Sequence, residues 1–396
     1  MSWPTYSSYK PCEVPWLHEI PASWEVDKFR HCFRESNEKN GPTPTGEMLS
    51  ISGYRGVEIK EYDDDNRKRT VEELEEYRVV RRGQLAVNTM WLNHAGLGVS
   101  SFEGHISPAY RSYWISHHLE PRFVHHLMRS SAYVDGYTAL LTGIRPNSLQ
   151  LSRDDLMSFP VLVPPRSDQL SIAGFLDRET AKIDALIDKQ EQLIATLRED
   201  RAATISQAVT FGLGSANRPV ERQQLRRLAL IRNGADHSEV QDDFGEFPVY
   251  GSGGEFTRAS RPLYSGPSVL LGRKGTIDRP LLVDGEFWTV DTMFCAQPYA
   301  NVDPTFLYYA CTTIPFDLLS TSTALPSMTQ SSLNSVRLPK PSYEEQRAVA
   351  DFLDDRCSKI DALIDKATEM IQVLREYRSA LITNAVTGKI DVREAV

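Results

Sequence analysis

The chain has 396 residues, which is enough for two or three domains, and its 6 Trp, 16 Tyr and 15 Phe exclude a disordered protein. The 44 Lys and Arg against 53 Asp and Glu give a formal net charge of −9. This balance argues against coating nucleic acid through bulk basic charge and against electrostatic anchoring to a membrane. The odd number of dispersed cysteines indicates free thiols. No apolar window is long enough for a membrane helix or a signal peptide, so we expect a cytoplasmic protein without membrane contact.

The first segment, residues 12–163, is rich in Gly, Pro, Ser, Thr and aromatic residues and predicts a mixed α/β domain. Short apolar runs predict strands, and Gly-containing clusters at Gly41-Pro42 and Gly96-Leu97-Gly98 predict turns. Helices are expected at 71–77 and 121–130. The predicted strands are Val79-Val80, Gln84–Val87 and Pro160–Val163.

The second segment, residues 164–215, predicts one long helix. Apolar residues recur there at a three-and-four spacing, and no proline interrupts the stretch between Ser167 and Val209. Pro164-Pro165 ends the element that precedes the helix, and the glycines at 212 and 214 mark the C-terminal end of the helix. About 43 helical residues would extend roughly 65 Å, which is too long for a helix to hide in a small globule.

The third and fourth segments, residues 220–341 and 342–390, repeat this order of a domain followed by a long helix. Strands are expected at 268–271 and 281–283, turns at 251–254 and 284–285, and a helix at 304–312. Ser342 followed by Glu345 forms a capping-box pattern at the start of the second long helix. Gly388 marks the exit of this helix.

The two predicted helices are an internal duplication. Lys182–Lys189 recurs letter for letter as Lys359–Lys366, and about half of the pairs from Pro164/Pro341 to Thr210/Thr387 are identical at a constant offset of 177 residues. The two domains that precede the helices show no such similarity, so the duplication is visible in the sequence only in the helices.

Two long helices with matching apolar stripes are expected to bury those stripes against each other as an antiparallel coiled coil with a pseudo-twofold repeat. The alternative is that each helix packs separately on its own domain. The predicted core of the helix pair is Ile183, Leu186, Ile187, Leu197, Ile360, Leu363, Ile364 and Leu374.

Catalytic and metal-binding motifs are weak. Asp303-Pro304-Thr305-Phe306 lacks the second proline of an amino-methyltransferase loop, and Glu58-Ile59-Lys60 lacks the Pro-Asp partner of a nuclease site. The pairs His117-His118 and His125-His126 have no acidic or cysteine partners at ligand spacing, and Asp63–Asp65 lack an EF-hand pattern. We therefore predict no catalytic residues, no metal site and no cofactor.

DNA contact needs only placed hydrogen-bond donors, and several clusters supply them. The glycines in 251–254 and 272–276 would let the backbone approach a duplex closely, which makes these two segments the stronger candidates. A solvated charge with no function is the alternative for each residue. The predicted DNA-binding residues are Arg67, Lys68, Arg69, Asn88, Asn93, Ser252, Gly253, Arg273, Lys274 and Thr276.

Over essentially its full length, the chain resembles the specificity subunit of Type I restriction–modification systems. The resemblance is carried by residues 16–26, by 83–90, by the Pro-rich entries at 164–169 and 340–346, and by the Lys-Ile-Asp-x-Leu-Ile and Leu-Arg-Glu-x-Arg stretches of both helices. The helix motifs are specific, whereas those inside the domains are weak. Asp168 stands where this family usually carries Glu, and it keeps the charge.

The resemblance implies two target-recognition domains, each recognising one half of a bipartite target in double-stranded DNA, with the helices setting the gap. It also implies docking of two methyltransferase subunits and, in the nuclease complex, of restriction/translocase subunits. The chain itself would be a non-catalytic specificity subunit. The alternatives are a coiled-coil scaffold that binds proteins and a solitary DNA methyltransferase.

Overall fold

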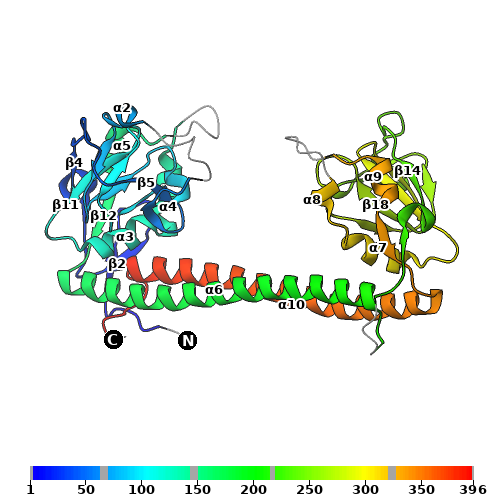
Figure 1. Ribbon diagram of the computed structural model, residues 1–396. Coiled ribbons are helices and arrows are strands. Elements are labelled where there is room, and N and C mark those ends of the chain that lie inside the picture. Colours follow the sequence, from blue (N-terminus) through cyan, green and yellow to red (C-terminus); the bar gives the residue numbers. More distant parts are fainter. Residues whose placement is uncertain (1–2, 63–69, 143–149, 215–218, 320–326, 395–396) are drawn as a thin grey trace. The chain divides into compact units, whose positions relative to one another are not determined.

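A computed structural model of the chain describes residues 3–62, 70–142, 150–214, 219–319 and 327–394 (Figure 1). The chain divides into two compact units. Unit 1 consists of Met1–Lys189 and Met370–Val396, and unit 2 consists of Gln190–Glu369. The boundaries fall inside both long helices, so each unit contains one α/β domain and a part of each helix. The compact units therefore cut the chain differently from the four predicted segments.

The two long helices are α6 (Arg166–Phe211) and α10 (Tyr343–Val386), drawn in green and in orange to red in Figure 1. The capping box predicted for α10 is present, since the Glu345 N–H donates to Ser342 Oγ at 3.3 Å and the Ser342 N–H donates to the Glu345 carboxylate at 3.0 Å. Gly212 and Gly388 follow the helix ends with positive φ of 71° and 75°, a backbone conformation that side chains with a Cβ disfavour.

Ion pairs join the two helices in each unit. In unit 1, Arg378 Nε of α10 lies 2.9 Å from Asp184 Oδ1 of α6. In unit 2, Arg201 Nε of α6 lies 2.9 Å from Asp361 Oδ1 of α10. The early part of α6 thus pairs with the late part of α10 and the reverse, so the helices are antiparallel. Because 184 and 361, like 201 and 378, differ by 177, the two ion pairs are the same contact in the two repeats.

The apolar stripe of the helix pair is narrower than predicted. Leu186 and Leu363 are 46% and 51% exposed, so the prediction that they belong to the helix-pair core is wrong. Each precedes an apolar residue on the same helix, and one residue turns the helix by about 100°, so adjacent positions cannot both face the partner helix. The six other predicted residues are buried or half-buried: Ile183, Ile187, Leu197, Ile360, Ile364 and Leu374.

The domain of unit 1 contains two four-stranded sheets, in the orders β6-β5-β10-β7 and β4-β11-β8-β9, and the two-stranded pairs β12-β3 and β1-β2. Short helices accompany them. The strands are Tyr9–Pro11 (β1), Glu19–Pro21 (β2), Glu25–Lys28 (β3), Phe33–Ser36 (β4), Glu47–Ser52 (β5), Gly56–Ile59 (β6), Arg78–Val80 (β7), Leu85–Val87 (β8), Leu97–Val99 (β9), Gly104–Ile106 (β10), Arg111–Ile115 (β11) and Pro160–Val163 (β12). The helices are Phe29–Cys32 (α1), Val71–Leu74 (α2), Leu92–His94 (η2), Pro121–Arg129 (α3), Ser131–Leu140 (α4) and Arg153–Ser158 (α5).

The domain of unit 2 also contains two four-stranded sheets, in the orders β16-β15-β20-β17 and β14-β21-β18-β19, and the pair β13-β22. The strands are Arg222–Gln224 (β13), Ala229–Asn233 (β14), Phe247–Gly251 (β15), Gly254–Ala259 (β16), Tyr264–Ser265 (β17), Ser268–Gly272 (β18), Leu281–Val283 (β19), Glu286–Thr289 (β20), Met293–Pro298 (β21) and Arg337–Pro339 (β22). The helices are Leu225–Arg227 (η4), Pro304–Thr312 (α7), Phe316–Leu319 (α8) and Gln330–Ser335 (α9).

Apart from the β1-β2 pair, which has no counterpart among the described residues of unit 2, the two domains share one topology. Adding ten to each strand number in the four-stranded sheets and in the β12-β3 pair of unit 1 gives the order in unit 2. The match includes the parallel pairings, of β5 with β10 and of β15 with β20. The duplication thus extends beyond the helices, where the sequence shows it, into both domains. Backbone hydrogen bonds and burial fix the strand order, and many side chains satisfy both.

A buried glutamine connects each domain to its long helix. In unit 1, Gln169 accepts a hydrogen bond from the N–H of Glu120, just before α3, at 2.7 Å, and donates to the Pro164 carbonyl at 2.8 Å. In unit 2, Gln346 accepts from the N–H of Asp303, just before α7, at 2.9 Å, and donates at 2.9 Å to the carbonyl five residues before it. These matched contacts make α3 and α7 the same element of the repeat.

The predicted short strands and helices are present, although the helix expected at 71–77 ends at Leu74, and one turn was misassigned. Gly96-Leu97-Gly98 was expected to be a turn, but Leu97–Val99 is strand β9, and Leu97 is buried opposite Val87. A Cβ on Gly98 would lie 3.1 Å from Gly56 Cα, so this glycine permits close packing of two strands. Among the described helices, none combines the length and the apolar character needed to cross a bilayer.

Candidate nucleic-acid interface

Three connections meet at one end of the unit 2 domain. Strands β15 and β20 are parallel, so the β15–β16 turn at Ser252 and Gly253 lies at the edge where β20 also ends. The Val290 N–H after β20 donates to the Tyr250 carbonyl at 3.1 Å. The next residues meet the loop after β18, because the Arg273 N–H donates to the Thr292 carbonyl at 2.8 Å. The structure thus brings the two predicted DNA-binding segments of this domain to one edge.

The side chains at this edge differ in exposure. The Arg273 guanidinium is half-buried, donates to the Asp291 carbonyl at 3.3 Å and lies 5.9 Å above the Phe294 ring. Lys274 and Thr276 are exposed. Among the described residues, no carboxylate forms an ion pair with the Lys274 ammonium. Arg273 therefore holds the loop in place, whereas Lys274 and Thr276 present their donors to solvent.

The glycines of the β18 loop serve the loop itself. A Cβ on Gly272 would lie 2.3 Å from the Thr276 carbonyl oxygen, and Gly275 has a φ of +79°. Both positions need glycine for the loop to fold back on itself. This differs from the expectation that these glycines bring the backbone close to a duplex. Gly253, in contrast, is exposed, and a Cβ added to it would meet no atom within 4 Å.

The corresponding edge of unit 1 carries the β5–β6 turn and the loop between β8 and β9. Arg129 of α3 joins them, since its guanidinium donates to the Gly53 carbonyl at 2.8 Å and to the Ala95 carbonyl at 3.1 Å. The two loops occupy the places of the β15–β16 turn and the β18–β19 loop in unit 2.

The predicted DNA-binding residues of unit 1 are placed less favourably. Asn88 is 5% exposed, and its side-chain oxygen accepts from the Met90 N–H at 3.2 Å, which argues against direct contact with DNA. Asn93 is half-buried, and its Oδ1 has no hydrogen-bond partner among the described residues. Arg67, Lys68 and Arg69, like Asp63–Asp65, lie outside the described residues.

Aromatic residues at these edges were missed by the sequence analysis. Trp91 is 57% exposed in the loop after β8, and Tyr54 is 43% exposed in the β5–β6 turn. In unit 2, Phe256 beside the β15–β16 turn is 57% exposed. Exposed aromatic faces can stack on nucleic-acid bases. Hydrophobic patterning treats these residues as core, so the available signal was only their position next to turn residues.

Other basic residues are neutralised inside unit 1. Arg81 forms ion pairs with Glu38 and Glu103, and Arg78 Nη1 lies 3.7 Å from Glu35 Oε1. These guanidiniums stabilise the domain and offer little free charge to a phosphate.

The histidines near α3 have structural partners. His126 Nε2 lies 2.9 Å from Asp177 Oδ1 of α6. His125 Nδ1 accepts from the Val99 N–H at 3.3 Å, and burial, helped by the charge of Arg129, lowers its pKa to about 3, so it is neutral at pH 7. Within the ranges that the structure describes, no three His, Cys, Asp or Glu side chains group as a metal site would require.

Residues 223–372 match the family model described as the Type I restriction modification DNA specificity domain. This segment contains most of the unit 2 domain and the first part of α10. The resemblance to Type I specificity subunits is confirmed.

A curated relative supports the resemblance to Type I specificity subunits at the sequence level. The Type I restriction enzyme StySPI specificity subunit of Salmonella potsdam is 29% identical over 100 residues, which are 25% of this chain. The match spans only 21% of the length of that relative.

Solved structures support the specificity-subunit fold over nearly the whole chain. One, on complex assembly and conformational transition of the type I R-M system, has a TM-score of 0.75 at 14% identity and covers 94% of this chain and 100% of that chain. The HsdS subunit from Thermoanaerobacter tengcongensis has a TM-score of 0.53 at 16% identity and covers 94% and 98%. At these identities the likeness concerns the fold alone.

The specificity-subunit fold leaves apolar side chains exposed on the helix pair of each unit. In unit 1, Leu186 of α6 is 46% and Met370 of α10 is 49% exposed; in unit 2, Leu193 of α6 is 45% and Leu363 of α10 is 51% exposed. The offset of 177 relates Leu186 to Leu363 and Leu193 to Met370. Each unit thus presents two exposed apolar residues at equivalent positions, and two of the four, Leu186 and Leu363, were predicted to be buried in the helix-pair core.

Proposed function

We propose that this chain is the DNA sequence-recognition subunit of a Type I restriction–modification complex. Each α/β domain recognises one half of a bipartite target in double-stranded DNA. The helix pair sets the spacing between the halves and docks methyltransferase subunits. The chain performs no chemistry of its own, and restriction/translocase subunits join only where the complex is a nuclease.

The observation that carries this proposal is the shared topology of two domains whose edge loops differ. The loop after β8 exposes Trp91 and Met90, whereas the loop after β18 exposes Lys274 and Thr276. Sequence recognition depends on which side chains reach the base edges, while the framework that holds them carries no sequence information. One framework with two sets of side chains suits recognition of two different half-sites.

The exposed apolar residues of the helix pair support docking of two copies of one partner. Large apolar side chains that recur at equivalent positions form two similar surfaces, and a duplicated surface binds the same partner twice. Leu186 and Leu363 are the related residues of the two surfaces. We expect Leu186→Asp to leave folding intact and to weaken methyltransferase binding, because this residue is 46% exposed.

The net charge of −9 bears on how the complex holds DNA. Carboxylates outnumber cations in this chain, so partner subunits supply most phosphate contacts in our proposal. The isolated chain should bind DNA weakly, and affinity that falls steeply with salt should emerge only in the assembled complex.

The test is methylome sequencing of cells that carry the chain with its methyltransferase partner, compared with cells that lack the chain. We expect a bipartite methylated motif that disappears with the chain. In gel shifts with the complex, Lys274→Ala should weaken or relax recognition of one half-site, whereas Lys366→Ala, the same change on an exposed residue of α10, should not. Absence of a bipartite motif, or methyl transfer by the purified chain alone, would contradict the proposal.

A further inference from the structure

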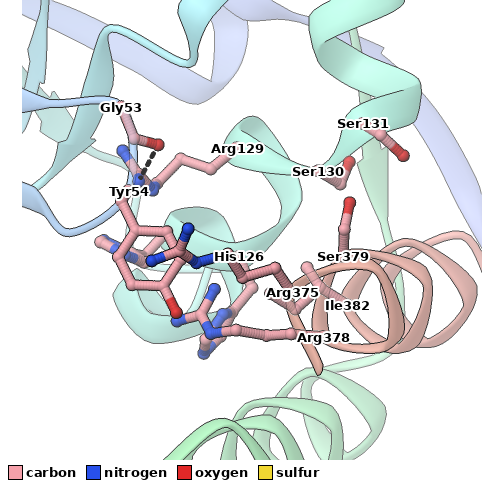
Figure 2. Close-up of a pocket in the computed structure, with 11 residues that line it drawn as sticks. Gly53, Tyr54, His126, Arg129, Ser130, Ser131, Arg375, Arg378, Ser379 and Ile382 are labelled. Atoms are coloured by element: carbon pink, nitrogen blue, oxygen red, sulfur yellow. Dashed lines mark hydrogen bonds between the residues drawn. The ribbon is translucent and has the colours of Figure 1, made fainter. Parts of the chain in front are cut away.

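A cavity of about 240 Å³ in unit 1 lies where the β5–β6 turn, the end of α3 and α10 come together (Figure 2). Its lining includes Tyr54 from the turn, Arg129 from α3, and Arg375, Arg378 and Ser379 from α10. Among the described residues that line it are three guanidiniums and no carboxylate. The cavity therefore has the donors and the charge to receive an anion.

Arg129 is held at the cavity by backbone carbonyls. It donates to the carbonyls of Ser52, Gly53, Ala95 and Leu97, and no carboxylate forms an ion pair with it among the described residues. Burial, helped by the charge of Arg378, lowers its pKa to about 10, so the guanidinium remains charged at pH 7. The charge of the Glu58 carboxylate opposes this lowering, but no ion pair joins Glu58 to Arg129 among the described residues. Because its hydrogen bonds go only to neutral groups, the buried cation leaves positive charge for a bound anion to balance.

Arg378 is fixed from two sides. Its Nε and Nη2 atoms lie 2.9 and 3.2 Å from the Asp184 carboxylate, and its guanidinium lies 4.8 Å from the centre of the Tyr54 ring. The Tyr54 hydroxyl donates to the same carboxylate at 2.6 Å. Asp184 thus offsets the charge of Arg378 but lies outside the lining, and His125 at the cavity wall is neutral.

We propose that this cavity binds a phosphate group of the DNA backbone, an inference that rests on the proposed function. Guanidinium forks match the oxygens of a phosphate, and the Ser379 hydroxyl adds a further donor. Arg129 is bonded to both the β5–β6 turn and the loop before β9, so a phosphate in the cavity lies beside the loops proposed to recognise bases. Free inorganic phosphate shares this chemistry, and the experiment separates the two sources.

Unit 2 repeats only part of the cluster. Arg198 and Arg201 correspond to Arg375 and Arg378 through the offset of 177, but the ninth residue of α7, in the place of Arg129, is Thr312. The position that corresponds to Ser131 is Ile314, which is buried. The phosphate contact should therefore belong to the half-site that unit 1 recognises, and Arg198 is an internal control.

The test uses the assembled complex and a duplex that carries the target found by methylome sequencing. Arg375→Ala should weaken binding about tenfold and lower the slope of log affinity against log salt by about one. Arg375→Lys should restore part of the affinity. Arg198→Ala should stay within about twofold of the wild type. Replacing one phosphate of the unit 1 half-site with a neutral methylphosphonate should lower the DNA affinity of the wild-type complex as much as Arg375→Ala does. The same replacement should not lower the affinity of the Arg375→Ala complex any further.

Other outcomes separate the possible failures. Specific DNA binding with equal affinities and slopes for the Arg375→Ala and Arg198→Ala complexes overturns the cavity proposal and leaves the proposed function standing. Absence of any specific DNA target contradicts the proposed function. In that case, inorganic phosphate is tested by thermal unfolding of the full chain. Stabilisation that Arg375→Ala abolishes assigns the cavity to the free anion, and no stabilisation overturns anion binding altogether.

Discussion

Units 1 and 2 have the same framework of strands and helix contacts, and they differ in the side chains of their edge loops. The buried glutamines, the Asp–Arg pairs between helices and the order of the strands recur in both units. The edge loops and the residues at the end of α3 and α7 do not recur. The comparison indicates that contacts between a domain and its long helix define the repeat, while the loops are free to diverge toward different targets.

Substitutions in the core of the helix pair should show the largest difference between the units in the loss of folding stability. Ile187 is 5% exposed in unit 1, whereas its equivalent Ile364 is half-buried in unit 2. Ile187→Ala should lower the free energy of unfolding by about 2–4 kcal/mol, and Ile364→Ala by about 1 kcal/mol, since the lost apolar contact and the residual cavity scale with burial. Urea denaturation of both variants measures this. Equal losses would show that the two halves of the pair are packed alike.

The exposed neighbours provide the control for this prediction. Leu186→Ala and Leu363→Ala should each change the free energy of unfolding by less than about 0.5 kcal/mol. A loss as large as that of Ile187→Ala would return Leu186 to the core, where the sequence placed it.

The buried glutamines should instead behave alike. Gln169 and Gln346 are 1% and 0% exposed. Replacing either with Met leaves the N–H of Glu120 or Asp303 without its acceptor, which should cost about 1–3 kcal/mol. Chemical denaturation of Gln169→Met and Gln346→Met should give losses within about 0.5 kcal/mol of each other. Markedly different losses would break the equivalence of the two connections.

The long helices, their caps and the duplication could be predicted from the sequence because each depends on local pattern. Ser342 and Glu345 form the box that their spacing predicted, and Gly388 ends α10. Exposure around the helix could not be predicted, because Leu186 and Ile187 are both apolar and only the partner's position separates them. The shared topology was invisible because strand order depends on pairing between distant segments, which single-sequence patterns do not encode.

The same limit applied to the candidate DNA site. Arg273 and Lys274 were found as a pair of basic residues, but the sequence could not show that Arg273 is used to hold the loop while Lys274 faces solvent. The cavity of unit 1 was missed altogether, because Tyr54, Arg129 and Arg375 come from three distant segments.

The two ion pairs between the helices should differ modestly in how much they stabilise the fold. Asp184 binds Arg378 and also accepts from the Tyr54 hydroxyl, whereas Asp361 binds Arg201. Asp184→Asn should therefore cost about 1–2 kcal/mol and Asp361→Asn less than about 1 kcal/mol, as expected for a partly buried pair and a more exposed pair. Thermal or urea unfolding of the two variants compares them. A larger loss for Asp361→Asn would contradict the role given to Tyr54.

The smallest expected effect concerns pH and distinguishes α3 from α7. Burial alone would raise the pKa of Asp177, but the hydrogen bond and charge of His126, together with Arg122, lower it below its ordinary value of 3.8. The equivalent carboxylate, Asp354, accepts instead from the Tyr309 hydroxyl at 2.8 Å. Because the folded-state pKa of Asp177 is depressed, its stabilising contribution is fully present above pH 3.8 and is lost as the pH falls through the lowered value.

Asp177→Asn should therefore lower the free energy of unfolding by less than about 1 kcal/mol at about pH 6, given the partial exposure of the pair, and have no effect at a pH below the lowered value. The matched variant is His126→Tyr, which gives α3 the residue that α7 carries. It should shift the pKa of Asp177, followed by NMR titration of its carboxyl carbon, back toward 3.8. An unchanged pKa in His126→Tyr would mean that Arg122 sustains the depression without the histidine, and that the α3 and α7 contacts are electrostatically equivalent after all.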